Sequence, residues 1–334
     1  MTRLRRPGPR PGVATKRALV VALTAATLLV AACSSSPGKA GAPASATPTS
    51  GATLSHAAAA ARSLLPASIK SSGVITVGAS FDYPPIIDAN VNNPSVPQGV
   101  APDLANALGT VLGVKFQFIN TAWPGQLPGL ASGKFDVLWG EVSDTAAREK
   151  TIADMVPYFL ALEGFLLPKG NPRHLTGFDS ACGLTIGVPI GSIEDTIIAG
   201  TNNTYCGPHG LKAIKIANYQ NTAATVTALQ SGQVDAVSLG YMGCSAYVKA
   251  DPNQFAAIEV PRDQTSPYET NLDAVAINKD TPGLSKAIAM GLADLAQSGQ
   301  FAAILSKLDV TSGMLDPSEI AVNPTTRTPA GTSS

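Results

Sequence analysis

An eight-residue pattern that occurs twice constrains the fold of this chain more than any other feature of its sequence. Segments 130–137 and 229–236 both read Leu-x-Ser-Gly-x-apolar-Asp-apolar. In each, the glycine stands between the end of a helical pattern and a short apolar run, a place where glycine commonly closes helices. Either two generic helix–turn–strand units coincide, or the chain contains two α/β lobes of similar build with a cleft between them. We expect two lobes.

Strand and helix patterns alternate around both copies, as they do in α/β proteins. Up to the first copy we expect strands at 74–79, 114–118 and 135–138, and helices at 103–112 and 126–132. Around the second copy we expect strands at 184–188, 213–216, 236–239 and 257–260, and a helix with Ser192 as its N-cap and Asp195 three residues on. A strand at 272–278 and two helices within 284–308 follow.

The first 33 residues have the pattern of an export signal. A basic region precedes the apolar residues 18–32, a stretch shorter than the about 20 residues of a membrane-spanning helix. Leu-Val-Ala-Ala-Cys at 29–33 resembles a bacterial lipobox, so we expect Cys33 to be lipidated and to become the mature N-terminus. A simple membrane anchor and an ordinary cleaved signal are the alternatives. Two arginines near the start do not make a twin-arginine signal, because the rest of that pattern is missing.

Two segments have compositions that cannot bury a core. Residues 33–63 and 324–334 are rich in Ser, Ala, Gly, Pro and Thr, so we expect a flexible tether and a disordered tail around the folded part. After the first 32 residues, 17 basic residues face 23 acidic ones. This negative balance, with no basic cluster, argues against a nucleic-acid partner. No further stretch is apolar enough for a multi-pass transporter.

Three cysteines follow Cys33. Cys182 precedes an expected strand and Cys206 follows the next expected helix, and export favours disulfides, so we expect the pair Cys182–Cys206. Cys244 would then be a buried free thiol. No Cys/His spacing fits a zinc site, and the sequence contains no G-x-S-x-G, H-E-x-x-H, G-x-G-x-x-G or phosphate-loop pattern. We therefore expect no metal and no cofactor, and we favour binding over catalysis.

Several ordered segments resemble those of family 3 extracellular solute-binding proteins, the type that serves ABC importers of polar amino acids. They are Gly-Val-Ala-Pro-Asp-Leu-Ala at 99–105, residues 123–136, Thr-Ala-Ala-Arg at 145–148, Phe-Leu-Leu-Pro-Lys-Gly at 165–170 and Gly-Val-x-x-Gly-Ser-x-Glu at 187–194. Each segment is short. Their order and spacing, between about residues 69 and 323, make the resemblance specific at the level of the family.

The resemblance implies a periplasmic-binding-protein-like type II fold, in which two α/β lobes joined by two hinge strands close on a solute. Lobe one would comprise residues 64–166 and 273–323, lobe two residues 167–272, with hinges near 164–169 and 272–278. The chain would be a monomer, anchored by lipid at the extracellular face of the cell membrane. It would deliver its solute to an ABC permease driven by an ATPase.

The resemblance also implies residues of the solute site. Arg148 matches an arginine whose planar guanidinium holds a carboxylate, although a pair with Asp144 on one helix is the alternative. Tyr83 and Trp123 match aromatic residues that sandwich the solute, or they pack in the core. Ser192 and the N–H groups that follow it would bind the same carboxylate, or only cap their helix. The further candidates are Gly140, Glu141, Ser143, Gly191, Ile193 and Tyr241.

One position departs from the family. Gly240 stands where the family usually has an aspartate for the solute's ammonium group, and Glu141 stands where a small residue is common. We therefore expect altered selectivity, with Glu141 or Tyr241 reshaping the pocket. Two other functions remain open: a secreted dehydratase or cell-wall lyase that uses Glu141 or Glu194 as its acid or base, and a module that senses a ligand for a membrane partner.

Overall fold

The structure of the protein is a computed structural model that describes residues 55–265 and 272–326. All of them belong to the compact unit formed by residues 52–334. The expected signal peptide, the lipidation of Cys33, most of the expected tether and residues 327–334 of the expected tail lie outside the described residues.

The described residues form helices and strands in alternation. The helices are α1 His56–Leu64, α2 Ala67–Ser72, α3 Val100–Leu112, α4 Gln126–Ala131, α5 Ala146–Thr151, α6 Ile193–Thr201, α7 Thr222–Gln230, α8 Tyr241–Ala250, α9 Arg262–Thr265, α10 Leu284–Gln297 and α11 Gln300–Lys307. The strands are β1 Val74–Ala79, β2 Asp82–Tyr83, β3 Ile87–Asn90, β4 Asn93–Gln98, β5 Lys115–Asn120, β6 Val137–Leu138, β7 Ala153–Leu160, β8 Glu163–Pro168, β9 Thr185–Pro189, β10 Lys215–Tyr219, β11 Ala236–Gly240, β12 Phe255–Glu259 and β13 Leu272–Asn278.

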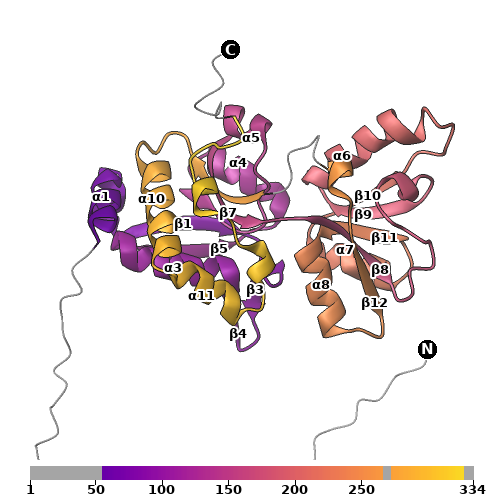
Figure 1. Cartoon of the computed structure of the whole chain (residues 1–334), viewed down its shortest axis with the longest axis horizontal. Helices are drawn as coiled ribbons and strands as arrows, with labels where there is room; N and C mark the ends of the chain where they lie inside the picture. The colour runs from indigo at the N-terminus through magenta and orange to yellow at the C-terminus, as the bar shows by residue number, and fades with distance from the viewer. Residues whose placement is uncertain (1–54, 266–271, 327–334) are drawn as a thin grey trace, which may run out of the picture. The chain divides into compact units, whose positions relative to one another are not determined.

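Two five-stranded sheets with the same topology form two lobes (Figure 1). Their strand orders are β5-β1-β6-β13-β7 and β10-β9-β11-β8-β12. In each sheet the first three strands are parallel, and the fourth is antiparallel to both of its neighbours. The fourth strands are β13 and β8, and each is the first strand after the chain passes from one lobe to the other. The expectation of two similar α/β lobes is confirmed.

The repeated pattern builds the third strand of each sheet. Segment 130–137 joins α4 to β6, and segment 229–236 joins α7 to β11. Gly133 and Gly232 both have φ of 73°, a left-handed conformation that strains other residues. The aspartates have matching partners: Asp136 accepts hydrogen bonds from the N–H and hydroxyl of Thr76 at 2.7 Å, and Asp235 accepts one from the N–H of Thr185 at 2.8 Å. Each aspartate therefore ties the start of the third strand of its sheet to the second strand, β1 or β9.

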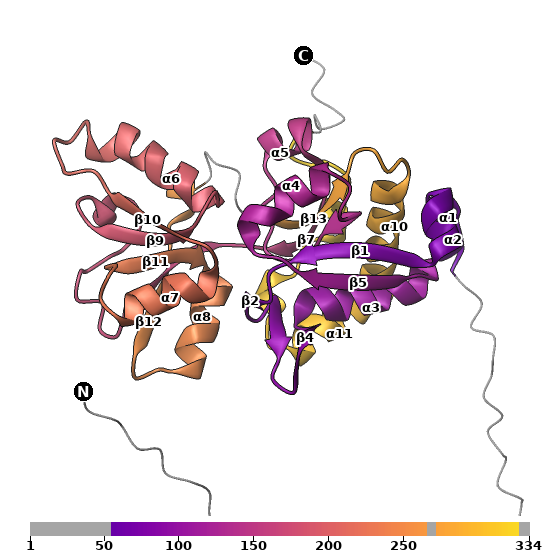
Figure 2. The same ribbon diagram turned by 180° about the vertical axis from the view of Figure 1, so that it is seen from behind.

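Helices cover both faces of each sheet, because the side chains of successive strand residues point to opposite faces. On the first sheet, α3 and α10 share one core with Ile75, Val77 and Val275, while α4 lies on the other face with Leu138 and Ala276. On the second sheet, α6 packs on one face and α7 with α8 on the other (Figure 2).

The boundary between the lobes differs from the prediction. Residues 163–166, expected in lobe one, begin β8 and pair with β11 and β12 of the second sheet. The first crossing is therefore the short segment 161–162 between β7 and β8, and the predicted hinge at 164–169 lies almost wholly inside a strand of lobe two. The chain returns to the first sheet at β13, whose predicted bounds are confirmed, and residues 266–271 before it lie outside the described residues.

The predicted tether and tail are too long. Residues 56–63 are not a tether, because α1 packs on α3 and α10 with Ala58 and Ala61 buried. Arg62 on α1 donates to the carbonyl oxygens of Thr110 and Val111 at 2.8 and 2.6 Å, which satisfies groups at the end of α3. At the other end, the N–H groups of residues 325 and 326 donate to the carboxylate of Glu149.

Other expectations concern cysteines, membranes and charge. Cys182 and Cys206 form the expected disulfide, with Cα atoms 5.7 Å apart, and Cys244 is buried with a free thiol.

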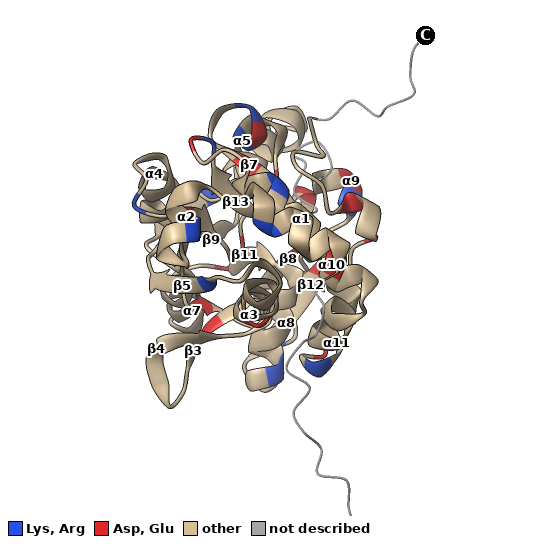
Figure 3. Cartoon of the chain, turned by 90° about the vertical axis from the view of Figure 1, so that its left-hand side faces the viewer, with Lys and Arg blue, Asp and Glu red and all other residues tan. Residues whose placement is uncertain are grey.

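Within the described residues no single helix is long and apolar enough to span a membrane; only the pair α10 and α11, bent by 77°, passes that test. On the side of the molecule in Figure 3, basic and acidic residues are interspersed among uncharged ones.

Candidate functional site

The parallel strands of both sheets direct their carboxyl ends toward one cavity. Ser80 follows β1 and Gly140 follows β6 in lobe one, while Pro189 ends β9 and Asn221 follows β10 in lobe two. Ligands of α/β proteins bind outside the carboxyl ends of the strands, where polar groups of the connecting loops gather. The cavity measures about 590 Å³, including space that is open to solvent.

Eight of the ten predicted solute-binding residues line this cavity. They are Tyr83, Trp123, Gly140, Glu141, Ser143, Arg148, Ser192 and Ile193. Gly191 and Tyr241 are not among the lining residues. Gly191 turns the chain before α6 with φ of 71°, and its N–H donates to Asp195. Tyr241 begins α8, and its N–H donates to the carbonyl oxygen of Leu162 at the crossing, so the structure does not bring it to the pocket.

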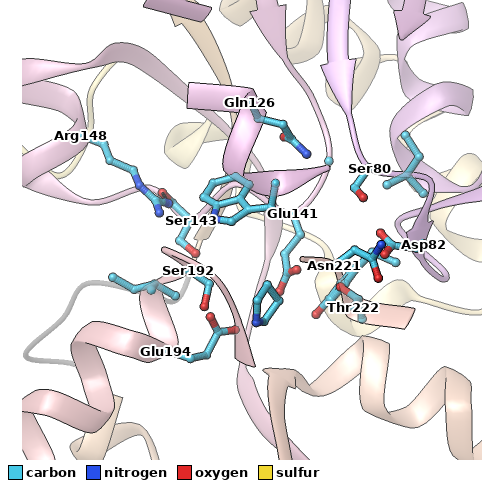
Figure 4. A pocket seen from close by; sticks show the side chains of 16 residues that line it. Ser80, Asp82, Gln126, Glu141, Ser143, Arg148, Ser192, Glu194, Asn221 and Thr222 are labelled. Carbon is cyan, nitrogen blue, oxygen red and sulfur yellow. Dashed lines mark hydrogen bonds between the residues drawn. The ribbon is translucent and has the colours of Figure 1, made fainter. Parts of the chain in front are cut away.

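Arg148 lies at one end of the cavity (Figure 4). Thr145 caps the short helix α5 by accepting a hydrogen bond from the N–H of Arg148 at 3.2 Å. The guanidinium donates to the carbonyl oxygen of Ser143 at 2.7 Å and lies 5.2 Å from the ring centroid of Trp123. Burial lowers the pKa of Arg148 from its usual value. Asp144, the alternative partner of Arg148, precedes α5 and is also buried, and its charge acts to raise the pKa that burial lowers.

The buried position of Tyr83 explains why residue 240 is a glycine. Tyr83 is 4% exposed, and its hydroxyl donates to the carbonyl oxygen of Gly240 at 3.2 Å, which joins lobe one to lobe two. A Cβ atom at position 240 would collide with that hydroxyl and would lie 3.4 Å from Oε1 of Glu141. The side chains of Tyr83 and Glu141 thus fill the space that any larger residue at position 240 would need. Burial, followed by the charge of Glu141, raises the pKa of Tyr83 well above its usual value.

Glu141 follows β6 and reaches toward lobe two. Its Oε1 accepts a hydrogen bond from the N–H of Gly240 at 3.4 Å. Removal from water, and then the neighbouring charge of Glu194, raise the pKa of Glu141 well above its usual value. The carboxyl group of Glu141 therefore lies beside the position where an aspartate was expected, but it comes from the opposite lobe.

The first turn of α6 contributes from lobe two. Ser192 is the N-cap residue by position, as predicted, although its side chain makes no capping hydrogen bond. Asp195, three residues on, accepts a hydrogen bond from the N–H of Gly191, while the N–H of Ser192 donates to the carbonyl oxygen of Pro189. Ser192 Oγ is buried without a hydrogen-bond partner among the described residues. Glu194, 3% exposed, lines the cavity nearby, and its burial raises the pKa of its carboxyl group.

The chain matches one protein family over most of its folded part. Residues 75–308 match the family described as bacterial extracellular solute-binding proteins, family 3. The chain belongs to this family.

Relatives of this solute-binding protein have related descriptions. An arginine-binding protein of Corynebacterium glutamicum is 25% identical over 267 residues, which are 79% of this chain and 83% of that protein. The lysine/arginine/ornithine-binding periplasmic protein of Escherichia coli is 24% identical over 228 residues, 68% of this chain and 84% of that one.

Two solved structures are also similar to this solute-binding protein. An ancestral arginine-binding protein bound to glutamine has a TM-score of 0.62 at 26% identity and covers 71% of this chain and 98% of its own. The ancestral amino acid-binding protein AncCDT-1, a precursor of cyclohexadienyl dehydratase, has a TM-score of 0.60 at 26% identity and covers 72% and 97%. The expected type II periplasmic-binding-protein fold is confirmed.

Sequence reasoning missed seven of the sixteen residues that line the cleft of this solute-binding protein. They are Ser80, Asp82, Ile87, Gln126, Pro189, Asn221 and Thr222, while Glu194 was considered only as the acid or base of an enzyme. Ser80, Asn221 and Thr222 lie within three residues after the carboxyl end of a parallel strand, and Pro189 ends one, so the strand predictions already contained a signal for these four. In Figure 4, Arg148 and Ser143 lie at one side of the pocket and Asp82, Asn221 and Thr222 at the other, with Glu141 between them.

The charges that line the cleft are unequal. Three carboxyl groups, those of Asp82, Glu141 and Glu194, face a single basic side chain, that of Arg148. Among the described residues no group of three or more His, Cys, Asp and Glu side chains is arranged to hold a metal ion. The arrangement suits a small organic solute that offers an anionic group to Arg148 and positive charge to the acids.

Proposed function

We propose that this protein is the solute-binding component of an ABC importer and captures a small amino-acid-like solute between its two lobes. The observation that carries this proposal is the guanidinium of Arg148, buried at one end of a cavity whose other charged groups are acids. A permease and an ATPase would receive the solute. The amino-acid-binding relatives support the same class of solute.

The solute's carboxylate would bind Arg148. Arginine does not lose its proton in proteins, and its planar guanidinium offers parallel N–H donors that match the two oxygens of a carboxylate. One nitrogen of the guanidinium already donates to Ser143, which fixes the plane of the group for a carboxylate on its other edge. The rings of Trp123 and Tyr83 would pack on the apolar body of the solute.

The solute's ammonium group would bind Glu141. The aspartate that usually binds this group is replaced by Gly240, and the carboxyl group of Glu141 lies against that glycine. An ammonium group near Glu141 would also compensate a carboxylate that burial alone disfavours.

Mass spectrometry of the small molecule that copurifies with the protein tests the proposal. We expect a compound with a carboxylate, and Glu141→Gln should weaken its binding strongly if it also carries an ammonium group. Glu259→Gln is the control, because Glu259 is exposed at the end of β12. A copurifying compound without an anionic group would contradict the role of Arg148.

We also propose that a lipid on Cys33 holds the protein at the extracellular face of the membrane. The lipobox-like segment 29–33 supports this anchor. Cys33→Ser should release the protein into the medium or leave its signal uncleaved, as fractionation and the mass of the N-terminal peptide would show. Normal processing with normal membrane retention would contradict the anchor.

A secreted enzyme on the same fold is the second candidate. Glu141 and Glu194 line the cavity with raised pKa values, as a general acid requires, and one similar structure is a precursor of a dehydratase. Incubating the protein with its copurifying compound separates the candidates: an unchanged compound supports binding, and a new product supports catalysis.

A further inference from the structure

Four carboxyl groups from four different parts of the chain line the cleft or lie close to it. Glu141 follows β6, Glu194 lies in the first turn of α6, Glu163 begins β8 and Asp273 is the second residue of β13. Glu163, Glu194 and Asp273 are 5%, 3% and 2% exposed. Of the four, Glu141 and Glu194 line the cavity, whereas Glu163 and Asp273 belong to β8 and β13 and are not among the lining residues.

Backbone contacts connect these groups. Gly240, whose N–H donates to Glu141, is paired with Glu163 in the register of β11 and β8. Asp273 is bridged to Ser143, the residue whose carbonyl oxygen holds Arg148. The cluster therefore extends from the expected ammonium position to the expected carboxylate position.

The cluster has too little positive charge around it. The groups that face it are Arg148, Asp144, Asp195, Tyr83, Tyr158 and Cys244. Arg148 is the one cation among them within the described residues. Oε2 of Glu163 and Oδ1 of Asp273 are buried without a hydrogen-bond partner there. Several adjacent buried carboxyl groups cannot all be ionised, so the empty cleft must hold protons on some of them.

A solute changes this balance according to its own charge. Its carboxylate uses the charge of Arg148, and one ammonium group only cancels that carboxylate. A zwitterion therefore leaves the acids as uncompensated as before. A solute with a second positive group offsets the acids instead and lets them lose protons to the buffer.

We propose that Glu163 and Asp273 form, with Glu141 and Glu194, a four-carboxyl cluster that selects solutes of net positive charge by exchanging protons for them. This inference rests on the proposed amino-acid function and names the charge class of its solute. Glu163 and Asp273 are positioning residues, since they act through the two acids that line the cavity. Burial and the neighbouring acids raise the pKa of Glu163, and raise that of Asp273 to about 8, as proton holding requires.

The test is calorimetry of the full chain with two amino acids of nearly equal shape. L-Arginine carries a guanidinium group where L-citrulline carries a neutral urea group. We expect arginine to bind at least about tenfold more tightly than citrulline near neutral pH. Titrations in buffers of different ionisation enthalpy should show about one proton released per arginine and none per citrulline, so that arginine affinity rises from about pH 6 to about pH 8.

Variants of Glu163 and Asp273 test the role of the cluster without changing any residue that lines the cavity. Glu163→Gln and Asp273→Asn imitate the protonated carboxyl groups, so both should fold, bind arginine and release fewer protons with a smaller preference for arginine. The surface variant Glu259→Gln should change neither quantity.

The outcomes distinguish this inference from the function on which it rests. Equal affinity for arginine and citrulline, or arginine binding without proton release, overturns the cluster's role and leaves an amino-acid-binding protein. If the protein binds glutamine but neither arginine nor citrulline, the role of the cluster is also overturned, and an amino-acid-binding protein remains. Failure of every amino acid to bind overturns both proposals.

Discussion

At the residue scale, Arg148 is the group that we propose to orient the solute. Its guanidinium is buried beside Trp123 and fixed by Ser143, so its removal would leave a bound carboxylate without a charged partner. Arg148→Ala should weaken binding of the copurifying solute by about 2–5 kcal/mol, measured by calorimetry. Arg262→Ala, an exposed arginine on α9, should leave binding unchanged. Near-wild-type affinity of the Arg148 variant would remove the assignment of the carboxylate position.

A second residue-scale prediction concerns the missing side chain at position 240. Gly240→Ala would drive a Cβ atom into the hydroxyl of Tyr83, so we expect it to weaken solute binding by about 1–3 kcal/mol. Tyr83→Phe removes the hydroxyl oxygen and should restore part of the loss in the double variant. If the change in binding free energy of the double variant equals the sum of the changes in the two single variants, within about 0.5 kcal/mol, the two positions do not compete for space.

At the scale of single elements, α1 is part of the folded domain although its sequence is rich in alanine. Ala61 is fully buried in the interface with α10, and Ala59 on the same helix is exposed. Ala61→Glu should lower the free energy of unfolding by about 3 kcal/mol, because it places an unpaired charge in that interface. Ala59→Glu should have little effect, as urea titration of both variants would show. Equal stability of the two variants would mean that α1 is not docked in solution.

The helix α1 also shows where sequence reasoning stopped. Runs of β-branched residues specified β1 and β13, whose bounds were predicted correctly, because their patterns are local. A short alanine-rich helix has no apolar stripe of large residues, and its docking depends on α3 and α10. The strands β2 to β4 were missed because four prolines lie within residues 84–97, and β-propensity is low there.

The site was predictable to the same extent. Family motifs located eight cavity-lining residues, but the placement of Glu163 and Asp273 near the cleft depends on β8 and β13, two strands that are far apart in the sequence and belong to different sheets. No local pattern encodes that convergence. Gly240 was identified as unusual from the sequence, yet the reason, the position of Tyr83, is visible only in the folded chain.

At the scale of the whole molecule, the buried acids should make the free energy of unfolding of the domain depend on pH. Burial raises the pKa of Asp273 to about 8, whereas an exposed aspartate titrates near about 4. Between these values the folded protein binds more protons than the unfolded chain, so the free energy of unfolding falls as pH rises. Each such group lowers it by up to about 1.4 kcal/mol per pH unit within that window.

Thermal unfolding of the solute-free protein from about pH 5 to about pH 8 measures this signature. We expect the melting temperature to fall with pH in the native chain and to fall less steeply in Asp273→Asn, which cannot ionise at that position. The exposed substitution Glu259→Gln should keep the native slope. A cationic solute should oppose the fall, because it stabilises the ionised acids that destabilise the empty cleft. Identical slopes for Asp273→Asn and the native chain would mean that Asp273 is ionised throughout, and the cleft would then need another source of positive charge.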